Sequence, residues 1–410
     1  DRAVEADRDG ARQTIPDPAL VPAGPPRLCT TPDELQDVVA DVREAGVFAY
    51  DTEFIGEESY HPFICLMQIG TPRRVSLVDP LAVDNLDPVW ELLADPDIRT
   101  VVHAGQQDLE PVVRRLGKAP ARVVDTQMLA GFGRLPYPVS LRDLVETLLG
   151  VELGKSLTFT RWDKRPLSAR HQRYAADDVR YLLAAEAMLW ERLDAAGTTE
   201  LARDACATLG EADRYGFDLH ARMHRMLGRR RFNPTQLRAL HGLLQLRDRL
   251  AREHDRPPQS YLRDDVVVRV AKERPDSVSG LANLKGMPRP VAHAHGEDIL
   301  AACHDPEPRD FNPDDFVVPE EPGPESRHRV DALWAALQTY CYARGIDPAL
   351  VSNRRAVVRL VLDEPGDRIV PEAWQQRLLD EFLTKFVRSG HVWTLRCEDT
   401  RIRHEGFTEP

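Results

Sequence analysis

Three short apolar runs follow one another between residues 46 and 80, and turn-length polar segments separate them. They are rich in Val, Ile, Tyr and Phe, which predicts three consecutive strands joined by hairpins. Helical and strand patterns then alternate as far as residue 126, so the order predicts a mixed sheet with helices on its faces. The segments are GVFAYDTEF, FICLMQIGT and RRVSLVDP as strands, DPVWELLADP as a helix, RTVVHAG as a strand, QQDLEPVVRRLG as a helix and ARVVDT as a strand.

The remainder of the chain, beginning with SLRDLVETLLG at residue 140, has an almost entirely helical pattern. One long helix is predicted from about Ser168 through ARHQRYAADDVRYLLAAEAMLWERL. Further along, PTQLRALHGLLQLRDRLAREHD places Pro234 at a helix start, and DDVVVRVAKERP predicts another helix.

Proline-rich polar segments mark the predicted boundaries. Residues 1–27 have the composition of a flexible arm. Immediately afterwards Thr31, followed three residues later by Glu34, forms a capping-box signal for the first helix. Residues 304–327 contain six prolines among acidic residues, which predicts a linker.

A weak internal repeat spans the predicted linker. Residues 256–270 align with residues 346–360 at an offset of 90, and Pro258 then matches Pro348. Both segments follow a long amphipathic helix. We therefore expect two tandem helical domains of one type.

The composition is that of a soluble globular protein, with 42% hydrophobic and 29% charged residues. A length of 410 residues favours two or three domains. No apolar run approaches the roughly 20 residues of a membrane span, and no signal-peptide pattern is present. The six cysteines lack zinc-site spacing, which indicates reduced, packed thiols. We expect a cytoplasmic monomer with no membrane partner.

Charge is distributed unevenly along the chain. The net charge is −12, yet residues 222–290 hold 16 Lys and Arg against 7 Asp and Glu. This stretch therefore carries +9 and the remainder −21. Such an asymmetry indicates a module that binds a polyanion, with Arg229, Arg230 and Arg231 as candidate contacts.

Two carboxylates are predicted on one face of the first strand. In an extended FAYDTEF segment Asp51 and Glu53 point to the same side, opposite to Thr52. Acidic residues are depleted in strands, so the pair needs an explanation. One is a solvent-facing strip on an exposed strand. The other is a site for a divalent cation, because hard cations prefer carboxylate ligands.

Further acids lie on predicted helices. Tyr174 and Asp178 are four residues apart, on one helix face, whereas Asp177 lies about 100° around the helix. Asp108 lies in the first turn of a helix that follows a strand. Each has a structural alternative: a surface pair for the first two, and a favourable interaction with the helix dipole for Asp108.

Taken together and in this order, Asp51 and Glu53, Asp108 after HAG, and Tyr174 with Asp178 resemble the three motifs of the DEDDy class of 3′-5′ exonucleases. The resemblance is closest to the ribonuclease D family. It covers roughly residues 30–195 and includes YHPFICLMQIG, DTQ and KRPLSARHQRYAADDVRYLL. The basic helical segment after it resembles the HRDC domain, and the second repeat resembles a diverged copy.

The resemblance implies an α/β exonuclease domain with a ribonuclease H-like mixed sheet and flanking helices, followed by two small all-α HRDC-type domains. The expected divisions are an arm at 1–27, the exonuclease domain at 28–215, an HRDC domain at 222–303, a Pro-rich acidic linker at 304–327, a second HRDC-like domain at 328–395 and a C-terminal tail at 396–410.

The resemblance also implies a role for each motif residue in a two-metal site that takes Mg²⁺ or Mn²⁺. Asp51 would bridge both ions, Glu53 and Asp178 would hold the ion nearest the attacking water, and Asp108 would support the other ion. Tyr174 would orient the water. Candidate phosphate contacts near the third motif are Arg161, Lys164 and Arg165.

The implied activity is 3′-5′ exoribonuclease action, which releases nucleoside 5′-monophosphates from single-stranded 3′ ends of RNA such as tRNA precursors. The motifs alone do not distinguish RNA from DNA, so a DNA-directed exonuclease in repair remains an alternative. A second alternative is a non-catalytic nucleic-acid-binding protein, although all four acids are present. A third is a protein-interaction scaffold.

Overall fold

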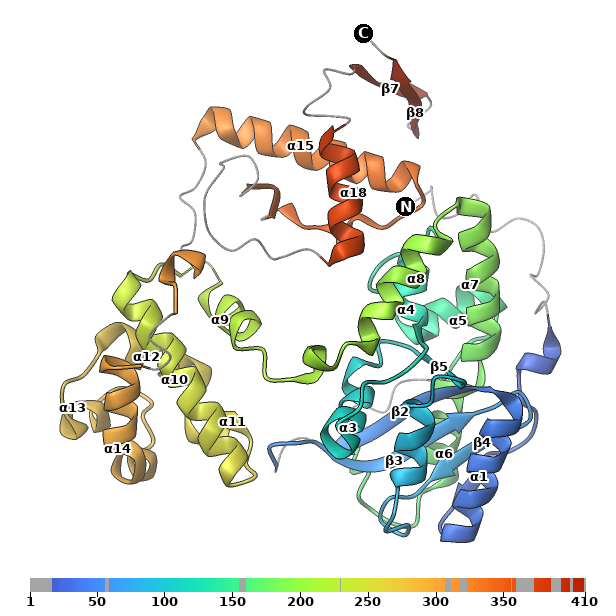
Figure 1. The fold of residues 1–410 in the computed structure, drawn as a ribbon, viewed down its shortest axis with the longest axis horizontal. Coiled ribbons are helices and arrows are strands. Elements are labelled where there is room, and N and C mark those ends of the chain that lie inside the picture. Colours follow the sequence, from blue (N-terminus) through green and yellow to red (C-terminus); the bar gives the residue numbers. More distant parts are fainter. Residues whose placement is uncertain are drawn as a thin grey trace.

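The computed structural model describes residues 17–55, 59–154, 160–228, 230–306, 311–316, 323–354, 356–358, 372–384, 392–398 and 401–408. Its N-terminal part is built on a mixed six-stranded sheet in the order β1-β4-β3-β2-β5-β6 (Figure 1). Antiparallel pairing joins β2 to β3 and β3 to β4, while the outer pairs are parallel. The strands are β1 (Arg27–Cys29), β2 (Val47–Ile55), β3 (Phe63–Gly70), β4 (Val75–Val78), β5 (Arg99–Val102) and β6 (Val123–Asp125).

The sheet confirms the predicted mixed architecture, and the three predicted hairpin strands are β2, β3 and β4. Strand β1 was missed, because its three residues lie at the end of the predicted arm and are too few to show a period. It pairs with β4 in parallel through Leu28. Thus the arm joins the sheet edge at Arg27.

Helices cover both faces of the sheet. Phe48 and Tyr50 pack with α1 (Pro32–Ala45), α2 (Asp87–Leu93) and α3 (Gln106–Leu116) on one face. Ala49, on the alternate face, packs with α6 (Ala169–Arg180). Strand β2 is therefore sandwiched between two helical layers, as its alternation requires. The side chain of Thr31 caps α1 in a capping box with Glu34, as predicted.

The long helix predicted from Ser168 is two helices. Ser168 caps α6, which ends at Arg180, and Tyr181 (φ −102°, ψ −6°) separates it from α7 (Leu182–Ala196). The break lets α6 lie on the sheet while α7 packs against the helices at its end. These are α4 (Thr126–Phe132), α5 (Leu141–Leu149) and α8 (Thr199–Ala207).

A second helical unit has its own core around α10 (Pro234–Glu253). As predicted, α10 begins at Pro234, and Asn233 caps it in a capping box with Gln236. The other helices are α9 (Leu219–Leu227), α11 (Pro258–Tyr261), α12 (Asp264–Glu273), α13 (Val278–Ala282) and α14 (Arg289–His304). Short 3₁₀ helices are η2 (Pro18–Leu20), η3 (Thr208–Gly210), η4 (Ala212–Tyr215) and η5 (Pro313–Phe316).

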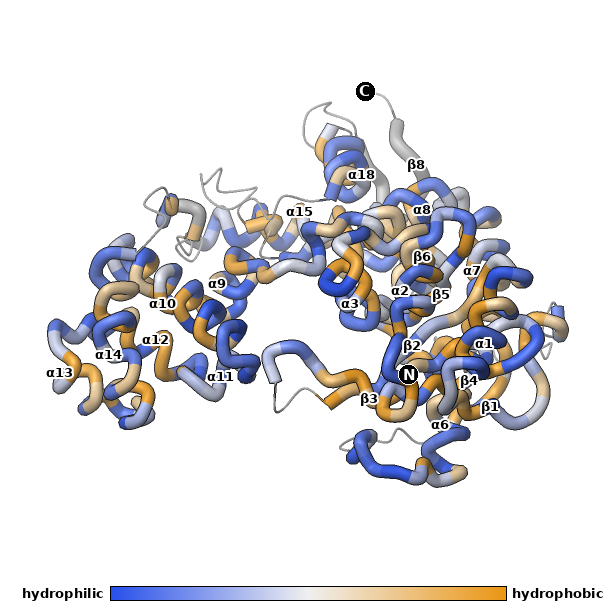
Figure 2. Tube along the Cα trace, turned by 60° about the horizontal axis from the view of Figure 1, so that its bottom comes forward, coloured by the Kyte–Doolittle hydropathy of each residue, from blue (hydrophilic) through white to orange (hydrophobic). Residues whose placement is uncertain are grey.

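This unit contacts the sheet domain through the β2–β3 hairpin, whose end points toward α11 in both views (Figures 1 and 2). The hydroxyl of Tyr60 donates a hydrogen bond to Asp248 at 2.6 Å, and its backbone N–H donates to Asp255 at 3.1 Å. The guanidinium of Arg252 lies over the Tyr60 ring. The strand that carries Asp51 is thereby linked to the helical unit.

The first two helices of the described C-terminal part begin 90 residues after α10 and α11. Helix α15 (Pro324–Ala343) has 20 residues, like α10, and the four-residue α16 (Pro348–Val351) matches α11. Helix α18 (Ala373–Leu383) follows. Because α15 begins at Pro324, the expected linker ends before residue 327. The expected boundary at residue 395 falls within a hairpin of β7 (Val392–Glu398) and β8 (Arg401–Thr408).

These C-terminal helices share a core with the sheet domain. Trp374 packs on Phe132 with ring centroids 5.2 Å apart. The N–H of Asp347 donates to the carbonyl of Gly131 at 2.7 Å. A Cβ at Gly131 would lie 2.3 Å from Leu350, so this close contact requires glycine. The second repeat is therefore packed onto the exonuclease-like domain.

The described cysteines Cys29, Cys65, Cys206, Cys303 and Cys341 are free and buried, as expected. None of the described helices combines the length and apolar character needed to cross a membrane.

Candidate active site

The candidate site lies where β2 extends beyond its parallel neighbour. Strand β5 pairs with β2 only as far as Ala49, whereas β3 continues opposite Asp51 and Glu53. After β5 the chain turns through Gly105 into α3, which begins beside this free edge. A Cβ at Gly105 would lie 2.5 Å from Cβ of Val102, so the tight turn needs glycine. The turn brings Asp108 to the strand that carries the first two acids.

Asp108 lies in the first turn of α3 and is 7% exposed. Its carboxylate accepts a hydrogen bond from the hydroxyl of Thr52. Thr52 points to the face of β2 opposite to Asp51 and Glu53. The carboxylate of Asp108 is therefore turned toward the far side of the strand, although it lies close enough to raise the pKa of Asp51.

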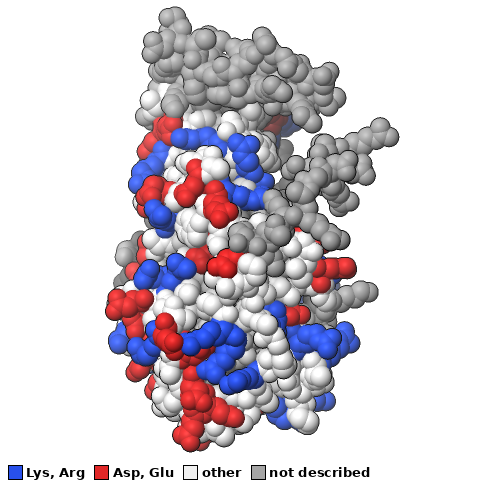
Figure 3. Space-filling view, turned by 90° about the vertical axis from the view of Figure 1, so that its right-hand side faces the viewer, with Lys and Arg blue, Asp and Glu red and all other residues white. Residues whose placement is uncertain are grey.

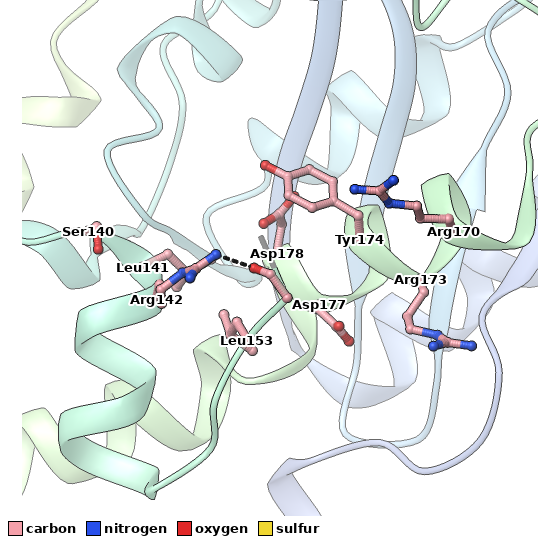
Figure 4. A pocket seen from close by; sticks show the side chains of 10 residues that line it. Ser140, Leu141, Arg142, Leu153, Arg170, Arg173, Tyr174, Asp177 and Asp178 are labelled. Carbon is pink, nitrogen blue, oxygen red and sulfur yellow. Dashed lines mark hydrogen bonds between the residues drawn. The ribbon is translucent and has the colours of Figure 1, made fainter. Parts of the chain in front are cut away.

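Asp178 and Tyr174 come from α6, which packs on the face of β2 that carries Asp51. Figure 4 shows the Tyr174 hydroxyl and the Asp178 carboxylate pointing the same way from one helix face. Asp177 points elsewhere and forms an ion pair with Arg180 at 3.4 Å. The four-residue spacing thus places the phenol of Tyr174 and the carboxylate of Asp178 on the same side of α6, whereas the carboxylate of Asp177 points away from them.

Burial raises the pKa of all four carboxyl groups, and repulsion within the cluster raises the pKa further for Asp51, Glu53 and Asp178. Desolvation is the largest cause for each, and the charges of Asp108 and Asp178 further raise the pKa of Asp51 well above its usual value. The pKa of Glu53 is raised to about 8, with contributions from Asp51 and Asp108. The pKa of Asp108 is raised to about 6, and the charge of Glu53 helps to raise that of Asp178.

No lysine or arginine offsets this charge: in the described ranges none forms an ion pair with any of the four carboxylates. Buried carboxylates without a partner are costly unless they coordinate a cation or take up protons. The donor set, four oxygen-rich groups with unpaired charge, suits hard divalent cations. Even so, no three His, Cys, Asp or Glu side chains of the described chain already stand in metal-holding geometry.

Tyr174 remains protonated at neutral pH. Burial raises the pKa of its phenol, and the charges of Asp178, Glu53 and Asp51 raise it further. Its ring centroid lies 6.1 Å from that of Trp162, which helps to fix the ring. The hydroxyl can therefore donate or accept a hydrogen bond beside Asp178, but it cannot serve as a free base.

Two of the three residues predicted to contact phosphate near the third motif, Arg161 and Arg165, bind other groups of the protein. Arg161 pairs with Asp163 at 2.7 Å. The guanidinium of Arg165 donates to Asp79 at 2.6 Å and to the carbonyl of Cys65 at 2.7 Å. Arg165 thus anchors its loop to the sheet, in contrast to the predicted phosphate contact. Lys164 is exposed.

Of the three consecutive arginines predicted as polyanion contacts, Arg229 lies outside the described residues. Arg230 donates to the carbonyl of Met226 at 2.8 Å, and Arg231 is exposed. On the face shown in Figure 3, Lys and Arg are interspersed with Asp and Glu among the described residues. Among the described residues, that face offers a polyanion no continuous basic surface.

Sequence reasoning missed three arginines that surround a cavity of about 870 Å³ beside Tyr174 and Asp178. They are Arg142 on α5 and Arg170 and Arg173 on α6 (Figure 4). The available signal was helical spacing, since Arg170 precedes Tyr174 by four residues. Arg142 could not be found in this way, because its proximity depends on how α5 packs.

Comparison with known proteins identifies the family. Residues 26–194 match the model of a 3′-5′ exonuclease domain, and residues 236–303 match that of the HRDC domain. Ribonuclease D of Gluconacetobacter diazotrophicus is 31% identical over 399 residues, covering 95% of this chain and 97% of that protein. The chain belongs to the ribonuclease D family. Ribonuclease D of Escherichia coli K12 is 30% identical over 338 residues, covering 82% and 89%.

A solved structure agrees with this placement. The crystal structure of Escherichia coli RNase D, "an exoribonuclease involved in structured RNA processing", matches with a TM-score of 0.71 at 28% identity, and covers 88% of this chain and 99% of that one. The predicted fold class is confirmed, and so is the predicted enzyme class: this member of the ribonuclease D family is a 3′-5′ exoribonuclease.

Proposed function

We propose that the chain removes nucleoside 5′-monophosphates from the 3′ ends of structured RNA, such as tRNA precursors, with two divalent cations held by Asp51, Glu53, Asp108 and Asp178. One observation carries this proposal: in the described part of the chain, these four buried or half-buried carboxyl groups have raised pKa values and no cationic partner. Such a cluster is stable as carboxylates only with bound cations.

The electrostatic neighbours support a distinct role for each acid. Asp51 feels the charges of both Asp108 and Asp178, so it lies between them and is the natural bridging ligand. Glu53 and Asp178 interact with each other and would share the ion nearer Tyr174. Asp108, held by Thr52, would support the other ion less directly. When bound, the cations supply charge neutralisation and Lewis acidity at the scissile phosphate, from either Mg²⁺ or Mn²⁺.

Tyr174 would position the attacking water. Its hydroxyl is protonated and points with the Asp178 carboxylate into one space (Figure 4). Accepting a hydrogen bond from water, the phenol oxygen would direct a lone pair of that water toward phosphorus. The role is orientation rather than proton removal, since a raised pKa makes a phenolate unavailable near pH 7.

The HRDC unit would hold the body of the RNA. Its stretch from residue 222 to 290 carries 16 Lys and Arg against 7 Asp and Glu, in a chain whose net charge is −12. Phosphate contacts of this kind bind without reading sequence. Structured RNA as the substrate is further supported by the RNA processing role named for the Escherichia coli relative.

The test is digestion of a 5′-labelled tRNA precursor with a single-stranded 3′ extension in the presence of Mg²⁺. We expect a ladder that shortens from the 3′ end, release of 5′-mononucleotides and complete loss of activity with EDTA. Asp51→Asn should abolish the ladder, whereas the neighbouring Asp177→Asn, which alters a carboxylate outside the cluster, should not.

Three results would contradict the proposal: activity in EDTA, internal fragments instead of a ladder, or full activity in Asp51→Asn. A matched DNA strand degraded as fast as the RNA would contradict the assignment of RNA as substrate. Circular dichroism of Asp51→Asn and Asp177→Asn separates lost chemistry from lost folding.

A further inference from the structure

The arginines around the cavity beside Tyr174 and Asp178 have no assigned function. The cavity, of about 870 Å³, opens between α5, the segment at Leu153 and Gly154, and α6. Tyr174 and Asp178 of the candidate catalytic cluster line it, together with the acidic residue Asp177 (Figure 4). Its three basic lining residues are Arg142 on one side of Tyr174 and Arg170 and Arg173 on the other. A space of this size, bordered by a reactive centre and by cations, suits an anionic ligand.

Helical spacing relates the arginines to the catalytic residues. Arg170, Tyr174 and Asp178 follow at intervals of four residues and share one helix face. At 1.5 Å per residue, each step is about 6 Å along α6. The base of Arg170 therefore lies one turn from Tyr174 and two turns from Asp178, with Arg173 beside it. The eight residue steps from Arg170 to Asp178 therefore span about 12 Å along α6.

The arginines of α6 have free guanidinium groups. Within the described ranges, neither Arg170 nor Arg173 forms a hydrogen bond or an ion pair, and both are exposed. Asp177, a carboxylate that also lines the cavity, forms an ion pair with Arg180, and the charge of Arg173 acts on it as well. The donors of Arg170 and Arg173 are therefore available to a ligand.

Arg142 approaches the cavity from the opposite side. Its guanidinium donates to the carbonyl of Gly154, as the dashed line in Figure 4 marks, and its charge acts on the Tyr174 phenol. The single carbonyl contact orients the group while leaving other N–H donors unused. Two separate elements thus present cations to one space, which scattered surface arginines do not do.

The direction of the strand follows from the chemistry of exonucleolytic cleavage. The departing nucleotide is terminal and has a free 3′ hydroxyl, so every other phosphate of the RNA lies on the 5′ side of the scissile one. A group that binds a second phosphate near the site must therefore bind an upstream, non-scissile one.

We propose that Arg142, Arg170 and Arg173 form a binding site for the backbone phosphate next upstream of the scissile phosphate. This inference rests on the function proposed above. The arginines bind the phosphate through charge-assisted hydrogen bonds, independently of base sequence. The site gives longer strands an advantage over a dinucleotide.

The test compares substrates with and without an upstream phosphate. The dinucleoside monophosphate ApA has only the scissile phosphate, whereas a single-stranded ten-nucleotide RNA has eight more. For the triple variant Arg142→Gln, Arg170→Gln, Arg173→Gln, we expect KM for the decamer to rise on the order of 10²-fold with kcat little changed, because charge-assisted bonds are lost. For ApA, kcat/KM should stay within about twofold, since one phosphate leaves the site unoccupied.

A binding readout accompanies the kinetics. All proteins in this experiment carry Asp51→Asn and are kept in EDTA, so that the RNA is not cleaved. Fluorescence anisotropy then measures the affinity for the decamer at salt concentrations from roughly 50 to 200 mM, a range over which phosphate contacts change affinity by orders of magnitude. The triple variant should lower the slope of log affinity against log salt by about 0.7 for each phosphate that it no longer binds. Arg203→Gln, an exposed arginine on α8, is the matched control and should leave slope and KM unchanged.

The outcomes separate this inference from the proposed function. An equal loss on ApA and on the decamer would overturn it, because the arginines would then act on the scissile phosphate or on folding. Unchanged KM and an unchanged salt slope would overturn it as well. A wild-type protein that fails to cleave ApA and the decamer with Mg²⁺ would instead overturn the proposed function, and the anisotropy titration would still decide whether the arginines bind phosphate.

Discussion

The hydroxyl of Thr52 donates a hydrogen bond to the carboxylate of Asp108, from the face of β2 opposite to Asp51 and Glu53. A single strand therefore contributes to the site through both of its faces. Asp51 and Glu53 lie on one face of β2. Thr52, between them, points to the other face and binds Asp108, which belongs to α3. A rigid central strand thereby fixes three of the four carboxylates.

Thr52→Val tests this arrangement, since it keeps the β-branched shape and removes only the hydroxyl. The hydrogen bond from Thr52 lowers the pKa of Asp108, so its loss should raise that pKa above its present value of about 6. We expect kcat/KM near pH 7 to fall about tenfold and the pH-rate profile to shift to higher pH.

Thr100→Val is the matched control for that variant. Thr100 is buried on β5, and its hydroxyl has no hydrogen-bond partner in the described structure. Removing it should leave the pH-rate profile in place and cost no stability. Identical profiles for the two variants would show that the bond between Thr52 and Asp108 has no functional weight.

The carboxylate cluster predicts that the metal-free protein loses stability as pH rises. Glu53 and Asp108 have folded-state pKa values of about 8 and about 6, above the unfolded values of 4.5 and 3.8. Folding favours the protonated forms of both groups, and this preference contributes to the free energy of unfolding. The contribution is fully present below the unfolded-state pKa values and is lost as the pH rises through the folded-state pKa values. Asp108 alone accounts for about 3 kcal/mol at 1.36 kcal/mol per unit.

Thermal unfolding in EDTA from pH 5 to 8.5 measures this effect, over the window set by pKa values of about 6 and about 8. The Tm should fall across the window, and Mg²⁺ should restore it more strongly at the alkaline end, because cations bind the ionised groups. Asp51→Asn should show a flatter profile. A Tm that is unaffected by Mg²⁺ at pH 8 would speak against a cation site.

Tyr174→Phe removes the hydroxyl beside Asp178 and keeps the ring against Trp162. If the phenol oxygen positions the water, kcat should fall on the order of 10²-fold, as for the loss of one aligned hydrogen bond in a reacting site. RNA affinity in EDTA should not change. An unchanged kcat would reduce Tyr174 to a packing residue.

Trp374→Ala tests whether the C-terminal helices stabilise the exonuclease domain. Trp374 is 2% exposed and packs on Phe132, so its truncation should cost about 3–5 kcal/mol. Tyr342→Ala, at a ring that is 61% exposed, should cost little. Chemical denaturation of both variants measures the difference, and a Trp374→Ala protein as stable as the wild type would show that the helices dock without sharing a core.

Local signals in the sequence predicted local structure well. Thr31 and Glu34 identified the start of α1, Pro234 that of α10, and alternation along β2 its two faces. Each of these depends on neighbours within a few residues. The break at Tyr181 was missed because both halves of the predicted helix have a continuous helical pattern, and only packing on two different surfaces separates them.

Long-range relationships were beyond the sequence for the same reason. The contact of Arg165 with Asp79 spans 86 residues, and that of Thr52 with Asp108 spans 56. Nothing in the chain near Arg142 or Trp374 shows that the first faces a cavity and the second a domain core. The four acids were found from the sequence because their motifs resemble a family, whereas their burial and lack of cationic partners required the fold.

A count of bound Mn²⁺ ions decides whether these four carboxylates form a two-cation site. The protein is titrated with Mn²⁺, and the electron paramagnetic resonance signal of free aqueous Mn²⁺ gives the number of ions bound per chain. The titration is done at pH 8, because the pKa of Glu53 is raised to about 8. We expect two ions for the wild type and for Asp177→Asn, and at most one for Asp51→Asn, which lacks the proposed bridging charge. Equal binding by Asp51→Asn and the wild type, or no binding by the wild type, would contradict the proposed two-cation site.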